Sequence, residues 1–214
     1  VDVRRRIIRD AAIAMVGGKF AAIGKSADIE RLWQADQLIE GRGTVATPGL
    51  IDSHLHTSFQ LARGLADEAN AQSFLFEHMY PYEVAMHEED VHASVSLAAL
   101  EMLRHGVTCY IEPGNHHPDT TVRAVMDAGM RMVLGVSCFD NNQSATGLMP
   151  QAMIDSTAGC IDKTRALFEQ YPGRYADRLT VSASFRGMNN TTDALILALK
   201  EISQRYDLKD SKSS

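Results

Sequence analysis

The sequence predicts an α/β fold that is built around a mainly parallel sheet. From residue 50 onward, short apolar segments typical of buried strands alternate with longer segments whose apolar residues recur at helical spacing. Repeated strand-then-helix units imply crossover connections, which bring the strands into one sheet in parallel. Of the 214 residues, 45% are hydrophobic, which is ample for a packed core of this kind.

The first 48 residues follow a different pattern. Short apolar segments give candidate strands at residues 7–8, 11–16, 20–23, 37–39 and 45–46. The turn Gly17-Gly18-Lys19 separates two of these segments and favours a β-hairpin, and residues 27–35 are a candidate helix. We therefore expect a small β-rich domain at residues 1–48, before the alternating units begin.

Four strands and four helices are expected after Pro48-Gly49, a turn signal in which Pro pre-sets φ and Gly supplies a positive φ. The strands begin at residue 50 and then cover residues 107–111, 130–137 and 179–185. The helices cover residues 89–105, 119–128, 149–171 and 191–206. Acidic residues at the start of the first helix complement its dipole, and Gly106 follows its end. Four such units amount to half of a (β/α)₈ barrel.

The composition argues against several classes of function. The formal net charge is −6, the isoelectric point is near 5.7, and the longest basic cluster is Arg4-Arg5-Arg6, so a nucleic-acid-binding groove is not expected. No apolar run approaches the roughly 18 residues of a membrane span. Cys109, Cys138 and Cys160 are few and widely spaced, which predicts buried, reduced thiols in a cytoplasmic protein.

The most informative motif is His54-Leu55-His56, which lies at the far end of the strand that Leu50-Ile51 begins. Side chains two residues apart on a strand point to the same side, so both imidazoles can reach one metal ion. Neutral imidazole is the commonest metal ligand in proteins. Two ordinary strand or loop histidines would show the same spacing, so the surrounding sequence has to decide between these interpretations.

That surrounding sequence resembles the amidohydrolase superfamily. The similarity is carried by residues 48–56, by Arg63-Gly64-Leu65-Ala66-Asp67-Glu68, by Pro81-Tyr82-Glu83 and by residues 101–108. Within the superfamily, the sequence looks like the branch of cytosine and guanine deaminases, S-adenosylhomocysteine deaminase and triazine chlorohydrolases. The resemblance covers most of residues 11–200 and is much less specific about the substrate than about the superfamily.

The resemblance implies a partial TIM (β/α)₈ barrel of about four βα units at residues 49–208. Part of a small β-sandwich domain at residues 1–48 would precede it, and a polar tail at residues 209–214 would follow. The resemblance also selects a barrel over a doubly wound sheet, which the alternation of elements alone leaves open. On this comparison the chain looks like the N-terminal part of a longer enzyme, because Val1 starts partway into the sandwich and Ser214 stands where a fifth strand would begin.

Enzymes of the resembled branch activate water on a metal ion and displace ammonia, an amine or a halide from an electron-poor carbon of a nitrogen heterocycle. The resemblance assigns His54 and His56 as metal ligands and implies one divalent ion, zinc or iron. The family's third histidine ligand, its aspartate ligand and its proton-handling glutamate and histidine have no counterpart, since no histidine follows His117. Two imidazoles bind metal weakly, so we expect the 214-residue chain to be inactive by itself.

Further polar residues follow the predicted strands, at the edge where barrel active sites gather. The predicted substrate-binding residues are Gln60, Glu112, His116 and His117. Gln60 could offer its amide to a heterocycle, whereas Arg63 is interpreted as a structural clamp on loop carbonyls. A polar loop with ordinary turn residues is the alternative for Glu112 and the two histidines. Residues 137–140 and 186–190 are candidates by position only.

A different class of function also fits the sequence, namely a metal-free, barrel-derived binding or self-assembling module. A four-strand half barrel exposes a strand edge and apolar surface, so we expect a homo-oligomer. The expected partner is a small heterocyclic substrate, with no nucleic acid and no membrane. A dihydroorotase-like branch with a carboxylated lysine is disfavoured, because the predicted strand at residues 179–185 contains no lysine and Arg63-Gly64 fits the deaminase branch better.

Overall fold

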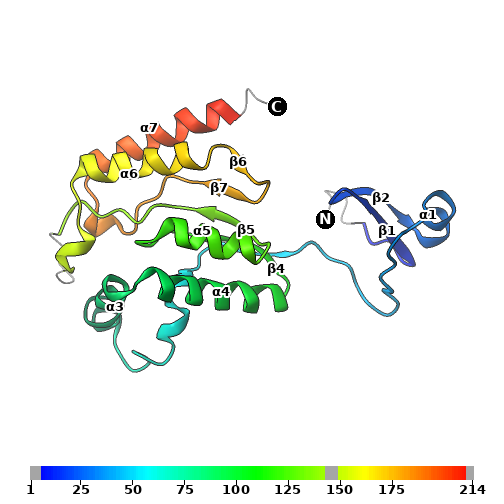
Figure 1. Ribbon diagram of the computed structural model, residues 1–214, viewed down its shortest axis with the longest axis horizontal. Helices are drawn as coiled ribbons and strands as arrows, with labels where there is room; N and C mark the ends of the chain where they lie inside the picture. The colour runs from blue at the N-terminus through cyan, green and yellow to red at the C-terminus, as the bar shows by residue number, and fades with distance from the viewer. Residues whose placement is uncertain (1–5, 143–148, 211–214) are drawn as a thin grey trace. The chain divides into compact units, whose positions relative to one another are not determined.

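The computed structural model describes residues 6–142 and 149–210. The chain divides into two compact units, residues 1–48 and residues 49–214. Figure 1 shows the elements of each unit along the chain. Part of the arginine triplet (residues 4–5) and residues 211–214 of the expected tail lie outside the described residues.

The first unit contains the predicted hairpin. Strand β1 (Ala11–Val16) pairs antiparallel with β2 (Lys19–Lys25), and the short helix α1 (Ser26–Leu32) follows directly. The strands expected at residues 7–8, 37–39 and 45–46 do not form, so this part of the prediction is wrong. Their apolar side chains are exposed, Leu38 by 83% and Val45 by 84%, and strand-like composition makes no strand without a neighbour to pair with.

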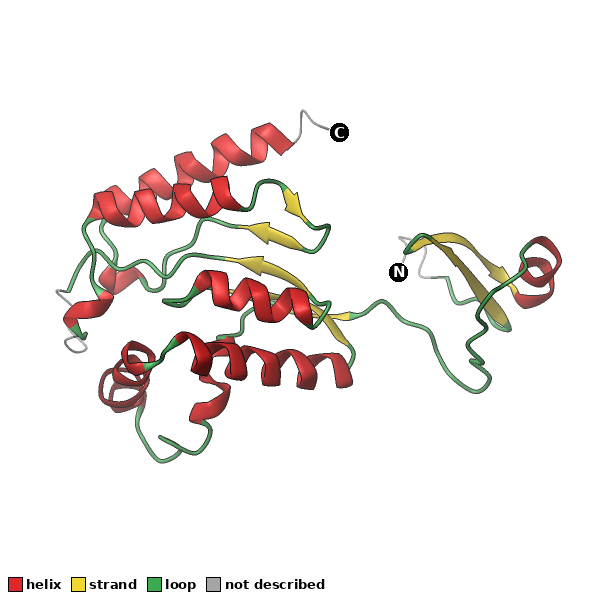
Figure 2. Cartoon of the chain, in the orientation of Figure 1, coloured by secondary structure: helices red, strands yellow, loops and turns green. Residues whose placement is uncertain are grey.

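The second unit is built on a five-stranded sheet in the order β3-β4-β5-β7-β6. Its strands are β3 (Leu50–Asp52), β4 (Val107–Glu112), β5 (Arg131–Leu134), β6 (Arg174–Tyr175) and β7 (Leu179–Val181). Neighbouring strands from β3 to β7 are parallel, and only the short edge strand β6 is antiparallel (Figure 2). The parallel strands follow one another across the sheet in chain order, without the reversal of a doubly wound sheet, as in a barrel.

Helices follow the parallel strands as predicted. They are α4 (Glu88–Arg104) before β4, α5 (Pro118–Asp127) after it, α6 (Thr157–Gln170) after β5 and α7 (Asp193–Asp210) after β7. Helices α4 and α5 pack side by side, and so do α6 and α7 (Figure 1). Gly106 has a φ of 80° just beyond α4, a left-handed conformation that glycine adopts without strain.

Several predicted boundaries are wrong. The helix expected from residue 149 begins only at Thr157, because the Ser156 side chain accepts a hydrogen bond from the Gly159 N–H and caps the helix there. The strands expected at residues 130–137 and 179–185 are shorter, since pairing stops at Leu134 and Val181. The polar tail expected at residues 209–214 is helical up to Asp210.

The segment between the paired histidines and α4 is more helical than the sequence indicated. It contains the 3₁₀ helix η1 (Thr57–Ala62), α2 (Ala71–Ser73), the π-helical turn η2 (Phe74–Met79) and α3 (Tyr80–Ala85). A further 3₁₀ turn, η3 (Gln151–Met153), precedes α6, and η4 (Met188–Asn190) precedes α7. In the sequence, these short elements lie between the end of a strand and the start of the next long helix. Residues of several of them contribute to the candidate site.

The core of the second unit lies where strands and helices meet. Its fully buried residues include Val95 and Ala99 of α4, Val125 of α5, Met132 and Leu134 of β5, Leu179 of β7 and Leu195 of α7. Cys138 and Cys160 are buried free thiols, as predicted, whereas Cys109 is partly exposed. In the described part of the chain, no helix is long and apolar enough to cross a membrane.

Candidate functional site

The candidate site lies at the carboxyl ends of parallel strands, where several polar side chains gather. His54 and His56 follow β3, and Glu112 ends β4. The strand prediction needs one correction, because β3 ends at Asp52 and both histidines lie just beyond it. The Leu55 N–H nevertheless donates to the Ile111 carbonyl at 3.0 Å, which keeps this segment beside β4.

The two imidazole rings lie together. Their centroids are 5.1 Å apart and the ring planes are nearly perpendicular, at 86°. His54 is exposed, whereas the His56 side chain is only 23% exposed. Burial, with smaller effects from the charges of Arg186 and His54, lowers the pKa of His56 to about 3. His56 is therefore neutral at neutral pH, with a lone pair available to a metal ion.

Glu112 lies behind His56 and is fully buried. Its Oε2 accepts hydrogen bonds from the Thr57 N–H at 2.9 Å and the Thr57 hydroxyl at 2.5 Å, and its Oε1 accepts one from the Gly114 N–H at 3.2 Å. Oε1 also lies 3.7 Å from His56 Nδ1. Burial raises the pKa of Glu112 to about 6, although the hydrogen bonds from Thr57 and Gly114 oppose that shift.

A second polar group joins α3 to the loop after β7. Arg186 Nη1 lies 2.6 Å from both carboxylate oxygens of Glu83, and their side chains are only 5% and 2% exposed. The same nitrogen donates to the Ser137 hydroxyl at 3.2 Å. The guanidinium lies over three aromatic rings at 5.7–6.0 Å from their centroids, those of Phe59, Tyr80 and Phe139.

The two groups are neighbours. Phe59 contacts the His56 ring, with centroids 5.6 Å apart, and also lies under Arg186. His116 Nε2 is 3.8 Å from Glu83 Oε1, and burial lowers the pKa of His116 although Glu83 acts in the opposite direction. The structure therefore places His54, His56, Glu112 and His116 at one edge together with Glu83 and Arg186, and the functional roles of the four remain predictions.

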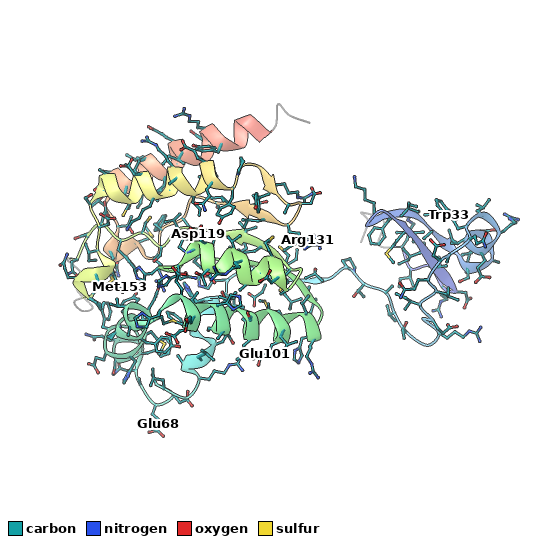
Figure 3. All side chains as sticks on the ribbon, in the orientation of Figure 1. Trp33, Glu68, Glu101, Asp119, Arg131 and Met153 are labelled. Carbon is teal, nitrogen blue, oxygen red and sulfur yellow. The ribbon has the colours of Figure 1, made fainter. Side chains whose placement is uncertain are left out.

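The polar side-chain atoms of two predicted substrate-binding residues, Gln60 and His117, are hydrogen-bonded within the protein. The Gln60 amide oxygen accepts a hydrogen bond from Arg63, which also pairs with Glu101 of α4. Figure 3 labels Glu101 on that helix. Arg63 is thus a structural clamp, as predicted, but it holds side-chain oxygens and not loop carbonyls. His117 Nε2 lies 3.1 Å from the Met86 carbonyl, which ties the start of α5 to the end of α3. The backbone N–H of His117 donates to Asn115 Oδ1.

Sequence reasoning underrated Glu83 and Arg186. Arg186 belongs to the segment 186–190 that was a candidate by position only, and Glu83 appeared only within the resembled Pro81-Tyr82-Glu83. A usable signal was present for each: a lone acid among apolar residues of α3, and a lone base directly after a predicted strand. Their pairing across 103 positions needed the structure.

The donors present fit part of a zinc site. Two imidazoles whose ring centroids lie 5.1 Å apart match the ligand type that zinc prefers, and His56 Nδ1 is a buried polar atom without a hydrogen-bond partner in the described part of the chain. Residues 6–142 and 149–210 contain no group of three or more His, Cys, Asp or Glu side chains placed to hold a metal ion. The described residues therefore supply two of the roughly three protein ligands of a catalytic zinc site.

Comparison with known proteins decides the family. The sequence profile of the amidohydrolase family matches residues 45–209. The chain belongs to the amidohydrolase family. A 5′-deoxyadenosine deaminase of Methanothrix thermoacetophila is 29% identical over 203 residues, which are 95% of this chain and 44% of that protein. A 5-methylthioadenosine/S-adenosylhomocysteine deaminase of Nitratidesulfovibrio vulgaris is 28% identical over 207 residues, 97% of this chain and 44% of that protein.

Solved amidohydrolase structures share the fold. A variant of the atrazine chlorohydrolase of Arthrobacter aurescens TC1, complexed with zinc and atraton, superposes with a TM-score of 0.84 at 23% identity, covering 96% of this chain and 48% of that one. An adenosine deaminase of Xanthomonas campestris with bound zinc gives 0.76 at 22% identity, covering 95% and 44%. The chain thus has the fold of about half an amidohydrolase barrel, as predicted, and spans less than half the length of these relatives.

Proposed function

We propose that this chain supplies the paired-histidine half of a metal-dependent amidohydrolase that acts on a nitrogen heterocycle. The observation that carries the proposal is the juxtaposition of His54 and His56, 5.1 Å between ring centroids, beyond the carboxyl end of β3. Family membership supports it, since relatives include deaminases of adenosine-type compounds and an atrazine chlorohydrolase. The reaction would add the oxygen of water to a ring carbon and release ammonia or a halide.

His54 and His56 would hold one divalent ion, with zinc favoured because three of the similar solved structures contain it. When bound, such an ion supplies Lewis-acid activation of water. The chain's own contribution is to present two imidazoles side by side, one of them held neutral by burial. With only two protein ligands among the described residues, binding to this chain alone is expected to be weak.

The substrate would lie against the edge that carries His116, Glu83 and Arg186. A flat heterocycle needs apolar faces and a few convergent polar groups, and Phe59 with Tyr82 supplies rings 6.1 Å apart there. Of the predicted substrate-binding residues, we retain His116, whose side chain is 29% exposed, as a substrate contact. Gln60, Glu112 and His117 remain predictions, and each is already bonded within the protein.

The test is release of ammonia from 5′-deoxyadenosine and S-adenosylhomocysteine, and of chloride from atrazine, in the presence of zinc. The 214-residue chain is assayed alone and after co-expression with the C-terminal half of the Methanothrix deaminase. We expect no turnover alone and turnover in the co-purified pair, lost on His54→Ala. Co-purification without turnover, or turnover that survives His54→Ala, contradicts the proposal.

A metal-free assembly module is the second candidate. The observation that favours it is the exposure of two adjacent apolar residues on β3, Leu50 by 61% and Ile51 by 69%. Because β3 is an edge strand, this surface is open to another strand. A measurement of metal binding distinguishes the two candidate functions. Binding that requires both His54 and His56 favours the hydrolase, because a metal-free assembly module does not need the two imidazoles.

A further inference from the structure

His56 Nδ1 is a buried polar atom that has no hydrogen-bond partner within residues 6–142 and 149–210. A neutral imidazole carries one N–H, so this nitrogen holds either a proton without an acceptor or a lone pair without a donor. Leaving a buried donor or acceptor unpaired is destabilising. We therefore expect His56 Nδ1 to form a hydrogen bond with the nearest available acceptor or donor.

Glu112 Oε1 stands beside it, 3.7 Å away. That distance is too long for a hydrogen bond, and a ring rotation or shift of under about 1 Å closes it to ordinary length. A carboxylate has roughly four lone-pair positions. Glu112 Oε2 accepts two hydrogen bonds from Thr57 and Oε1 accepts one from Gly114, so Oε1 keeps a position for one more donor.

The carboxylate is also held in place by the same turn that carries the histidine. Thr57 directly follows His56, and both its N–H and its hydroxyl donate to Glu112 Oε2. A fully buried carboxylate with three fixed hydrogen bonds cannot swing toward a ligand at the surface. It is placed to act on the His56 ring instead.

We propose that Glu112 is a positioning residue that accepts the Nδ1–H of His56. This bond fixes the imidazole in the Nδ1–H tautomer and leaves the Nε2 lone pair for a ligand. A carboxylate behind a ligating histidine orients the ring and raises its basicity, and its loss commonly weakens metal binding about 10- to 100-fold. The inference rests on the proposed function only in assigning His56 Nε2 to the metal ion. In this proposal Glu112 contacts His56 and does not contact the substrate.

The first test reads the tautomer without any metal. The 214-residue chain is labelled with ¹⁵N,¹³C-histidine, and His56 is assigned by comparison with His56→Gln. At pH 7.5 the ring ¹⁵N and ¹³Cδ2 shifts are expected to report the Nδ1–H form in the wild type. Observation of the Nε2–H form in the folded wild-type chain overturns the proposal, whether or not the chain binds zinc.

The second test removes the acceptor. Glu112→Met keeps the length of the side chain, and we expect the His56 signals to move to the Nε2–H form and the affinity for Zn²⁺ to fall about tenfold or more. Glu88→Met, at an exposed position at the start of α4, is the matched control and should leave the tautomer of His56 and the affinity for Zn²⁺ unchanged. If Glu112→Met does not fold, Thr57→Val is used in its place and should move the His56 signals part of the way to the Nε2–H form. Thr57→Ser should keep the wild-type signals. An unchanged tautomer in a folded Glu112→Met or Thr57→Val chain overturns the proposal.

Discussion

At the scale of single residues, Glu83 and Arg186 form a charge pair that water barely reaches. Their side chains are 2% and 5% exposed, and the guanidinium is surrounded by three aromatic rings. Taking both charges out of water is costly, and their contact together with the hydrogen bond to Ser137 compensates for it. Removing one partner leaves the other charge buried and uncompensated.

We therefore expect Arg186→Met to lower the free energy of unfolding by about 3 kcal/mol or more. The double variant Glu83→Gln, Arg186→Met should recover much of this loss, because no buried charge is left without a partner. Urea unfolding of both variants and the wild type checks the prediction. A single variant as stable as the double one would contradict it.

The residue-scale predictions from sequence succeeded where the chemistry was local. His54 and His56 are two positions apart, so their proximity follows from backbone geometry and a short segment suffices to see it. The contacts of His56 with Glu112 and of Glu83 with Arg186 span 56 and 103 positions. No pattern of periodicity reports such pairs, since they depend on how strand ends are brought to one edge.

At the scale of elements, Asp140 in the loop after β5 joins the starts of two helices. Its Oδ2 accepts hydrogen bonds from the Thr157 hydroxyl in the first turn of α6 and from the Thr192 hydroxyl just before α7. Its Oδ1 accepts the Thr192 N–H at 2.8 Å. Burial would raise the pKa of Asp140, but these hydrogen bonds outweigh it and hold the pKa below its ordinary value.

Asp140→Asn is expected to lower the free energy of unfolding by about 1–2 kcal/mol at neutral pH, because the charged acceptor is lost. A depressed carboxyl pKa stabilises the fold above the ordinary value of 3.8, and the stabilisation is lost as the pH falls through the folded-state pKa. The difference between wild type and variant should therefore be full at pH 7 and shrink below pH 3.8. Chemical unfolding across this range measures it, and a difference that grows on acidification would contradict the assignment.

Element predictions were accurate where start and stop signals stood at both ends. Helix α4 was expected at residues 89–105 and spans Glu88–Arg104, since acidic residues open it and Gly106 closes it. No element was predicted between the paired histidines and α4, yet this segment contains 3₁₀, π and short α turns that lack a long apolar period. The start of α6 was misplaced because Ser156 was not recognised as its cap.

At the scale of the whole molecule, the five-stranded sheet leaves one edge strand with exposed apolar side chains. Leu50 and Ile51 of β3 are 61% and 69% exposed, and Ile111 of the neighbouring strand β4 is 37% exposed. Relatives are more than twice as long as the chain, at 44% coverage. Such a surface favours pairing with further polypeptide, whether a second copy or another segment.

We expect the 214-residue chain to self-associate with rising concentration and Ile51→Lys to shift the equilibrium toward monomer. Lysine on an exposed edge strand opposes strand pairing without removing the fold. Sedimentation velocity from about 1 to 100 μM covers the usual range of weak association. Leu100→Lys, at an exposed position on α4, is the matched control, and an equal effect of both substitutions would contradict a role for β3.

The fold class was predictable at this scale because alternation of strands and helices dictates a parallel sheet. The barrel itself came from family resemblance, and the sequential strand order β3-β4-β5-β7 agrees with it. The nature of residues 1–48 as part of a sandwich stays a prediction, since a hairpin and one helix are what the described residues contain.

Zinc titration of the purified chain tests the central claim, that His54 and His56 form a metal site, most directly. With zinc in excess, we predict about one bound ion per chain, lost in His54→Ala and in His56→Ala and retained in His92→Ala, which alters a histidine of α4. Equilibrium dialysis with elemental analysis gives the count. Binding that survives either alanine substitution at the paired histidines, or no binding at all in the wild type, would contradict the account.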